Sequence, residues 1–93
     1  MKITFDPAKR RQTLDLRGLD FADAAAIFQS RHISQLDDRY EYGEKRFITY
    51  GYIGERIVAM VWTERSTTRR IISLRKANER EQKKFREALD RQG

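Results

Sequence analysis

Apolar and polar residues alternate over much of the second half of the chain, and this pattern predicts strands. Arg46–Tyr52 alternates among β-favouring residues, Arg56–Thr63 is the strongest strand pattern, and Arg69–Leu74 follows after a short polar break. Residues Gly51–Glu55 and Ser66–Thr68 are typical of the turns that join such strands. We therefore expect three antiparallel strands in a row here.

The first third of the chain changes to helical spacing after a short strand at Ile3–Phe5. Asp6 is a good N-cap and Pro7 suits the first helical position, which predicts a helix that ends at Gly18 in a left-handed cap. A second helix is expected after Asp20, with one apolar face at positions i, i+3, i+4 and i+7. Its members are Phe21, Ala24, Ala25 and Phe28.

Two further elements complete the expected fold. Ile33–Leu36 favours a strand, and the polar segment Asp37–Lys45 favours a turn. Asn78 and Glu81 have the spacing of a capping box, which predicts a last helix with a thin apolar stripe. The order β-α-α-β-β-β-β-α predicts an α+β fold, with a small, mostly antiparallel sheet packed against the N-terminal helices and a C-terminal helix. The length predicts a single domain, 1–93.

Composition narrows the range of possible functions. The chain has 20 basic and 14 acidic residues, and this excess favours nucleic acid or an acidic protein as partner. The absence of cysteine excludes disulfides, thiolate catalysis and zinc–thiolate sites, and one histidine cannot build a multi-histidine metal site. We expect no cofactor and no metal.

The longest apolar run, Ile57–Trp62, is too short to span a bilayer, and the N-terminus has no signal-peptide pattern. A cytoplasmic protein without membrane contact is therefore expected.

Arginines cluster where the last strands should end in neutral turn residues. Arg65, Arg70 and Arg75 are our main candidates for phosphate contact and for catalysis, because a planar guanidinium with five N–H donors matches a phosphate. Such a cluster can stabilise the charge that develops on a phosphate in the transition state. The alternative is that these arginines form structural salt bridges. Their candidate partners are Glu44, Glu64 and Glu81.

Strand alternation assigns the residues of the last strand to two faces. Ser73 and Arg75 fall on one face, which we expect to be the working or partner-binding face. Ile72 and Leu74 fall on the other face and should meet the helices. Arg70 shares the parity of Ile72, so it is expected to reach the working face only if it lies at a frayed strand start.

Other side chains are candidates for proton transfer or RNA contact. His32 is the natural general acid or base, although a histidine at a helix C-terminus can instead interact with the helix dipole. Trp62 is expected in the core. Lys9 could contact RNA or only water, Arg46 could pair with Glu44, and the tyrosines could stack on bases. The RNA-binding candidates are Lys9, Arg46, Tyr50, Tyr52 and Lys76.

Four blocks of the sequence, taken together, resemble the BrnT family of type II toxin–antitoxin toxins, which are small RelE-like ribonucleases. The resemblance spans nearly the whole chain, although Thr13 and Arg17 stand where the family often has asparagine and histidine. The blocks are Phe5-Asp6-Pro7-Ala8-Lys9, Phe21-Ala22-Asp23-Ala24-Ala25-Ala26-Ile27-Phe28, Gly43-Glu44-Lys45-Arg46-Phe47 with Gly51, and Thr63-Glu64-Arg65 with Arg70-Ile71-Ile72-Ser73-Leu74-Arg75-Lys76-Ala77 and Glu81.

The resemblance implies a RelE-like fold and a metal-independent endoribonuclease that cleaves RNA, free or on the ribosome, and so inhibits translation. It also implies neutralisation by a BrnA-like ribbon-helix-helix antitoxin, with operator DNA bound only through the antitoxin complex. The alternative from the residues alone is a non-catalytic basic module that binds nucleic acid or an acidic protein. Direct DNA binding is disfavoured, because there is no helix-turn-helix spacing and acidic residues interleave the last helix.

Overall fold

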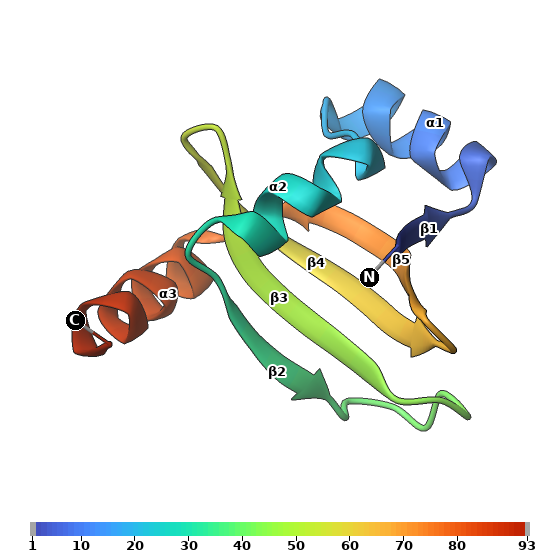
Figure 1. Ribbon diagram of the computed structural model, residues 1–93. Helices are drawn as coiled ribbons and strands as arrows, with labels where there is room; N and C mark the ends of the chain where they lie inside the picture. The colour runs from blue at the N-terminus through green and yellow to red at the C-terminus, as the bar shows by residue number, and fades with distance from the viewer. Residues whose placement is uncertain (1, 93) are drawn as a thin grey trace.

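The computed structural model describes residues 2–92, which form an α+β fold with a five-stranded mixed sheet (Figure 1). The predicted fold class and order of elements are confirmed, with one short 3₁₀ turn, Phe21–Asp23, added before the second helix. The strands are β1 (Lys2–Phe5), β2 (Ile33–Asp37), β3 (Arg46–Ile53), β4 (Arg56–Arg65) and β5 (Thr68–Lys76). The helices are α1 (Pro7–Arg17), α2 (Ala24–Gln29) and α3 (Glu79–Arg91).

The sheet has the strand order β1-β5-β4-β3-β2. Strands β2 to β5 form an antiparallel meander, because short connections join each strand to its neighbour. Strand β1 pairs in parallel with β5, and α1 and the other strands lie between them in the sequence. Strands β1 and β2 are therefore the two edges of the sheet.

Local signals fix the ends of the helices as predicted. The Asp6 carboxylate accepts a hydrogen bond from the backbone N–H of Ala8 at 2.9 Å, and α1 ends at Gly18 with φ of +66°. Asn78 and Glu81 form both halves of a capping box at the start of α3, because each side chain accepts from the backbone N–H of the other.

Helix α2 and the 3₁₀ turn cover one side of the sheet and bury the main core there. The buried side chains recur every third residue, at Phe21, Ala24 and Ile27, whereas the predicted position Ala25 is exposed. The 3₁₀ turn explains this shift, because three residues per turn align positions i and i+3 on one face. The sheet contributes Val58, Met60, Trp62, Ile71 and Leu74 to the same core.

Gly51 allows α2 to approach the sheet closely. A Cβ added at Gly51 would lie 2.8 Å from Cγ2 of Ile27 and 3.3 Å from Cβ of His32. Gly51 therefore belongs to β3, and the predicted turn Gly51–Glu55 is shorter than expected. The chain reverses at Gly54, where φ is +61°, between Ile53 and Arg56.

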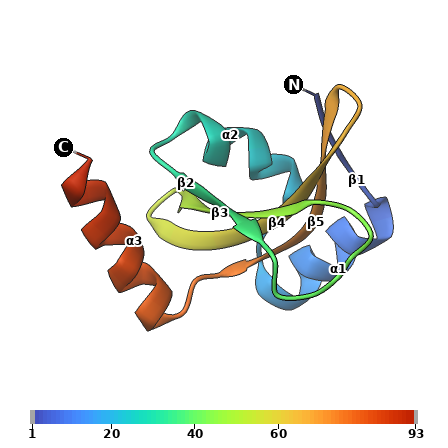
Figure 2. The same ribbon diagram turned by 90° about the horizontal axis from the view of Figure 1, so that it is seen from below.

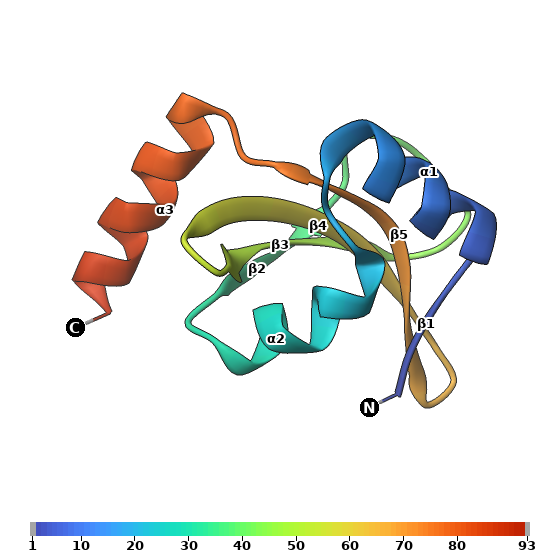
Figure 3. The same ribbon diagram turned by 90° about the horizontal axis from the view of Figure 1, so that it is seen from above.

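Helices α1 and α3 lie on the opposite side of the sheet from α2, as the views from below and above show (Figures 2 and 3). Phe85 and Leu89 of α3 pack against Ile57 at one end of the sheet. At the other end, α1 flanks β5, and Arg17 donates a hydrogen bond to the carbonyl of Leu74 at 2.9 Å. The sheet surface between α1 and α3 carries the candidate site.

Candidate functional site

A β-bulge in β5 brings the predicted arginines to one face of the sheet. Val61 pairs with Ser73 but Trp62 pairs with Ile71, so Ile72 is an extra residue on β5. Residues on either side of a bulge change their parity relative to each other. Arg70 and Arg75 therefore share one face, although alternation predicts opposite faces.

The register extends this face over three strands. Arg70 pairs with Thr63, Thr63 pairs with Arg46, and Arg65 lies two residues after Thr63 on β4. Directly paired residues of antiparallel strands project to the same side. We call this surface the arginine face, and it is defined by Arg46, Arg65, Arg70 and Arg75.

The bulge also corrects the prediction for Ile72. Leu74 is fully buried beneath α2 as predicted, but Ile72 packs against Ile48, Ala59 and Val61 on the arginine face. A strand with a bulge can place two side chains next to each other on one side, which strict alternation does not allow. Ser73 is half-buried beside Ile72.

Arg75 is held by Glu81 at the start of α3. The Nη1 and Nη2 atoms of Arg75 lie 2.7 and 2.8 Å from the two carboxylate oxygens of Glu81, and the hydroxyl of Tyr50 donates to Glu81 at 3.2 Å. The hydrogen bonds from Arg75 lower the pKa of Glu81 to about 2. Burial and the Glu81 charge raise the pKa of Tyr50. The sequence alternative of an Arg75–Glu81 salt bridge is therefore present in the structure.

Glu44 holds two more arginines at the other end of the arginine face. Its carboxylate accepts from Arg46 at 3.2 Å and from Arg65 at 3.4 Å, and the Arg46 guanidinium lies 4.2 Å from the ring centre of Tyr42. Arg70 forms no ion pair within residues 2–92. Arg70 is therefore the arginine of this face with the least internal compensation.

A buried carboxylate that was not predicted from the sequence lies beside this face. Asp37 is 6% exposed, and its two oxygens accept from Nε and Nη2 of Arg39 at 2.7 and 3.0 Å. The hydrogen bonds from Arg39 lower the pKa of Asp37. Asp37 pairs in register with Arg46, so it belongs to the arginine face. Asp37 was expected in a polar turn. Its burial follows from its pairing with β3, which the local sequence does not indicate.

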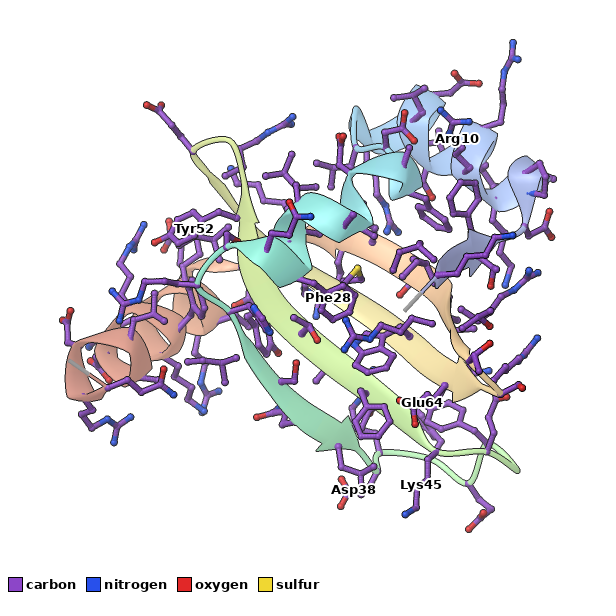
Figure 4. The ribbon with its side chains drawn as sticks, viewed as in Figure 1. Arg10, Phe28, Asp38, Lys45, Tyr52 and Glu64 are labelled. Atoms are coloured by element: carbon purple, nitrogen blue, oxygen red, sulfur yellow. The ribbon has the colours of Figure 1, made fainter. Side chains whose placement is uncertain are left out.

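Some predicted residues lie away from the arginine face. His32 lies on the α2 side, where its Nδ1 is 2.8 Å from the carbonyl oxygen of Ser30 and its ring meets Phe28 edge to face. Figure 4 shows Phe28 projecting from α2 over the sheet. Lys76 pairs with Val58, a core residue of the α2 side. The structure therefore does not bring His32 or Lys76 to the arginines.

Lys9, Tyr50 and Tyr52 lie on the arginine side of the sheet. Lys9 is exposed on α1 and lines a shallow hollow with Ile72 and Ser73. Tyr50 and Tyr52 share one face as predicted, but the Tyr52 ring packs against Phe85 of α3, with ring centres 5.5 Å apart. Of the two tyrosines, Tyr50 is the one that joins the cluster around Arg75.

Arg69 belongs to the cluster of arginines at the strand ends, but it was not among the predicted site residues. It pairs with Glu64 and lies on the α2 side, with its guanidinium 4.0 Å from the ring centre of Phe28 and 5.1 Å from that of Trp62. Its Nε is buried and has no hydrogen-bond partner within residues 2–92. Arg69 therefore packs as part of an aromatic cluster.

Within residues 2–92, no group of three or more histidine, cysteine, aspartate or glutamate side chains is arranged to hold a metal ion. Over the same range, no helix is long and apolar enough to cross a membrane.

Comparison with known proteins identifies the family. Residues 5–81 match the family described as "Ribonuclease toxin, BrnT, of type II toxin-antitoxin system". No curated protein matches the chain. The matched segment includes α1, the whole arginine face and Glu81. The chain therefore belongs to the BrnT family of ribonuclease toxins of type II toxin–antitoxin systems.

Proposed function

We propose that this chain is a metal-independent endoribonuclease that inhibits translation by cleaving RNA at the arginine face. The observation that carries the proposal is the convergence of Arg46, Arg65, Arg70 and Arg75 on one sheet surface between α1 and α3. Four guanidinium groups on one surface favour a polyanion, and the family supplies the reaction class.

The chemistry uses the 2′-hydroxyl next to the cleaved bond as the nucleophile. As it attacks the phosphorus, the hydroxyl loses its proton to water and the bond from phosphorus to the 5′-oxygen breaks. A 2′,3′-cyclic phosphate and a 5′-hydroxyl form, while negative charge builds up on the phosphate oxygens. Arg70 and Arg75 stabilise that charge. Glu81 occupies only the Nη1 and Nη2 ends of the Arg75 guanidinium, which leaves its Nε–H for a phosphate oxygen.

Tyr50 is our candidate for protonating the leaving 5′-oxygen. It shares Glu81 with Arg75, which places its phenolic proton beside the proposed phosphate site. His32, the candidate from sequence, lies on the other side of the sheet next to Phe28. Tyr50→Phe should therefore lower kcat by about 10²-fold, whereas His32→Ala should leave it within two-fold.

The test is cleavage of free RNA and of ribosome-bound mRNA by the purified chain in EDTA. We expect cleavage in EDTA, with 2′,3′-cyclic phosphate and 5′-hydroxyl ends. Cleavage that disappears in EDTA and returns with a divalent metal would contradict metal independence. Intact RNA with and without ribosomes would instead support the alternative, a non-catalytic binding module.

We further propose that a BrnA-like ribbon-helix-helix antitoxin neutralises the toxin by covering Ser73 and Arg75, and that the complex binds operator DNA through the antitoxin. The net positive charge of the chain and the partly exposed position of Ser73 and Arg75 support an acidic partner segment. Arg75→Glu should weaken both toxicity and antitoxin affinity. Loss of toxicity with unchanged antitoxin affinity would show that the two surfaces are separate.

A further inference from the structure

A groove between α3 and the edge of the sheet adjoins the arginine face. It has a volume of about 660 Å³. Ile33, Gln35 and Tyr50 line it from the sheet, and Arg80, Lys84 and Arg91 line it from α3. We call this hollow the α3 groove. None of its three basic residues has a role in the function proposed above.

The basic residues of the α3 groove form one stripe along the helix. At 100° per residue, Lys84 lies about 40° and Arg91 about 20° around the helix axis from Arg80. These three side chains form no ion pair within residues 2–92. Glu87 also lines the groove, whereas Glu81 is already neutralised by Arg75. Glu87 lies in the same stripe, about 20° around the axis from Arg80, so three basic side chains face one further glutamate and the groove keeps a net positive charge.

The α3 groove is continuous with the site around Arg75. Gln35, Tyr50 and Glu81 line both the α3 groove and a hollow of about 200 Å³ that contains Arg75. A polymer with one phosphate at Arg75 would thus meet the α3 groove next. A helix and a sheet edge with basic side chains and a tyrosine offer the combination that single-stranded nucleic acid favours.

We propose that the α3 groove binds the stretch of single-stranded RNA that flanks the cleaved bond, with Arg80, Lys84 and Arg91 contacting its phosphates. This inference rests on the proposed function, because it requires RNA at the arginine face. If the inference holds, the substrate is an extended single strand of RNA, and α3 takes part in binding it. The contacts lie beyond the reacting phosphate, so they act on affinity and leave the chemical step unchanged.

The test compares two double variants of the full chain that remove equal charge from α3. Arg80→Gln/Lys84→Gln removes two of the three basic residues that line the groove, and Lys83→Gln/Arg86→Gln removes two basic residues that do not line it. The probes are 2′-O-methyl RNA strands of about three, six and twelve nucleotides, which lack the nucleophilic hydroxyl and so report binding alone. Affinity is measured over a range of salt concentrations.

We expect the wild-type affinity to rise with strand length and the groove variant to lose that gain, on the order of ten-fold for the longest strand. Its salt slope should fall by about 1.4, since each phosphate contact with a single strand contributes about 0.7. The control variant should keep most of the length dependence. The shortest strand should bind both variants alike.

Four results would overturn the inference in distinguishable ways. Equal losses in both variants would show only diffuse electrostatic attraction. If short strands bind through Arg75 and longer strands bind no more tightly, the α3 groove does not bind RNA, and the proposed function is unaffected. Unchanged RNA affinity with weakened antitoxin affinity in the groove variant would assign the α3 groove to an acidic protein. Absence of RNA binding at every length would refute both the inference and RNA binding at the arginine face.

Discussion

Arg69 and Arg75 lie on the same strand but in opposite environments. Arg75 projects onto the arginine face, where Glu81 binds it through two hydrogen bonds. Arg69 projects to the α2 side, where its guanidinium packs against Phe28 and Trp62 and its Nε has no partner within residues 2–92. The difference shows that the side of the sheet, rather than the residue type, decides whether an arginine pairs with a carboxylate or packs against aromatic rings.

The same comparison shows what the sequence could predict. Caps such as Asp6 and Asn78 act through local hydrogen bonds, so their positions in the sequence were sufficient to place α1 and α3. The bulge at Ile72 was not predictable, because it depends on how β4 and β5 fit together rather than on a local signal. That single residue decides which side Arg70 takes.

The candidate site, like the fold, was predictable only in part. The arginines and Glu81 were identified from their clustering and spacing, whereas the burial of Asp37 depends on its pairing with Arg46 across the sheet. His32 follows α2 directly, and its side of the sheet depends on the close contact of that helix with Gly51. Long-range packing therefore determined the burial of Asp37 and the side of the sheet on which His32 lies, and local sequence patterns do not predict either.

The largest expected loss of stability is in the core of the α2 side. Trp62 is 6% exposed, and its Nε1 donates to the hydroxyl of Thr49 at 2.7 Å. Trp62→Ala should lower the free energy of unfolding by about 3–5 kcal/mol in urea denaturation followed by circular dichroism. Trp62→Phe keeps a ring and should lose about 1–2 kcal/mol. Equal, small losses in both variants would contradict the packing described for this side.

The contact between α2 and β3 should be the next most sensitive. Gly51→Ala adds a Cβ only 2.8 Å from Ile27, so either the helix or the strand must move. We expect a loss of about 1–3 kcal/mol in the same denaturation experiment. Gly54→Asn, in the turn of the same hairpin, is the control and should change stability by less than about 1 kcal/mol, because asparagine tolerates positive φ. A smaller loss for Gly51→Ala than for the control would refute the close contact.

On the arginine face, the Arg75–Glu81 pair should make stability depend on pH. The pKa of Glu81 lies below its ordinary value of 4.5, at about 2, so the pair stabilises the fold above pH 4.5 and loses its contribution as pH falls toward 2. Glu81→Gln keeps the capping box but should cost about 1–2 kcal/mol at neutral pH. Its stability should also change less than that of the wild type over this acid range. Parallel stability curves for the two proteins would contradict the assignment.

The smallest expected effect is at Arg69. Arg69→Met keeps a long side chain against Phe28 and Trp62 and removes the unpaired buried Nε. The lost cation–π contact and the removed desolvation cost should nearly cancel, leaving stability within about 1 kcal/mol of the wild type. A loss above 3 kcal/mol would show that Arg69 has a polar partner that this account omits.

The central claim is that RNA is cleaved on the arginine face and not on the α2 side. It is tested most directly by the initial rate of RNA cleavage in EDTA for Arg75→Gln and Arg69→Gln, each corrected for its folded fraction. We predict that Arg75→Gln lowers kcat/KM by about 10²–10³-fold, while Arg69→Gln stays within about three-fold of the wild type. Loss of cleavage in Arg69→Gln with activity retained in Arg75→Gln would place the reaction on the opposite side of the sheet and contradict the account.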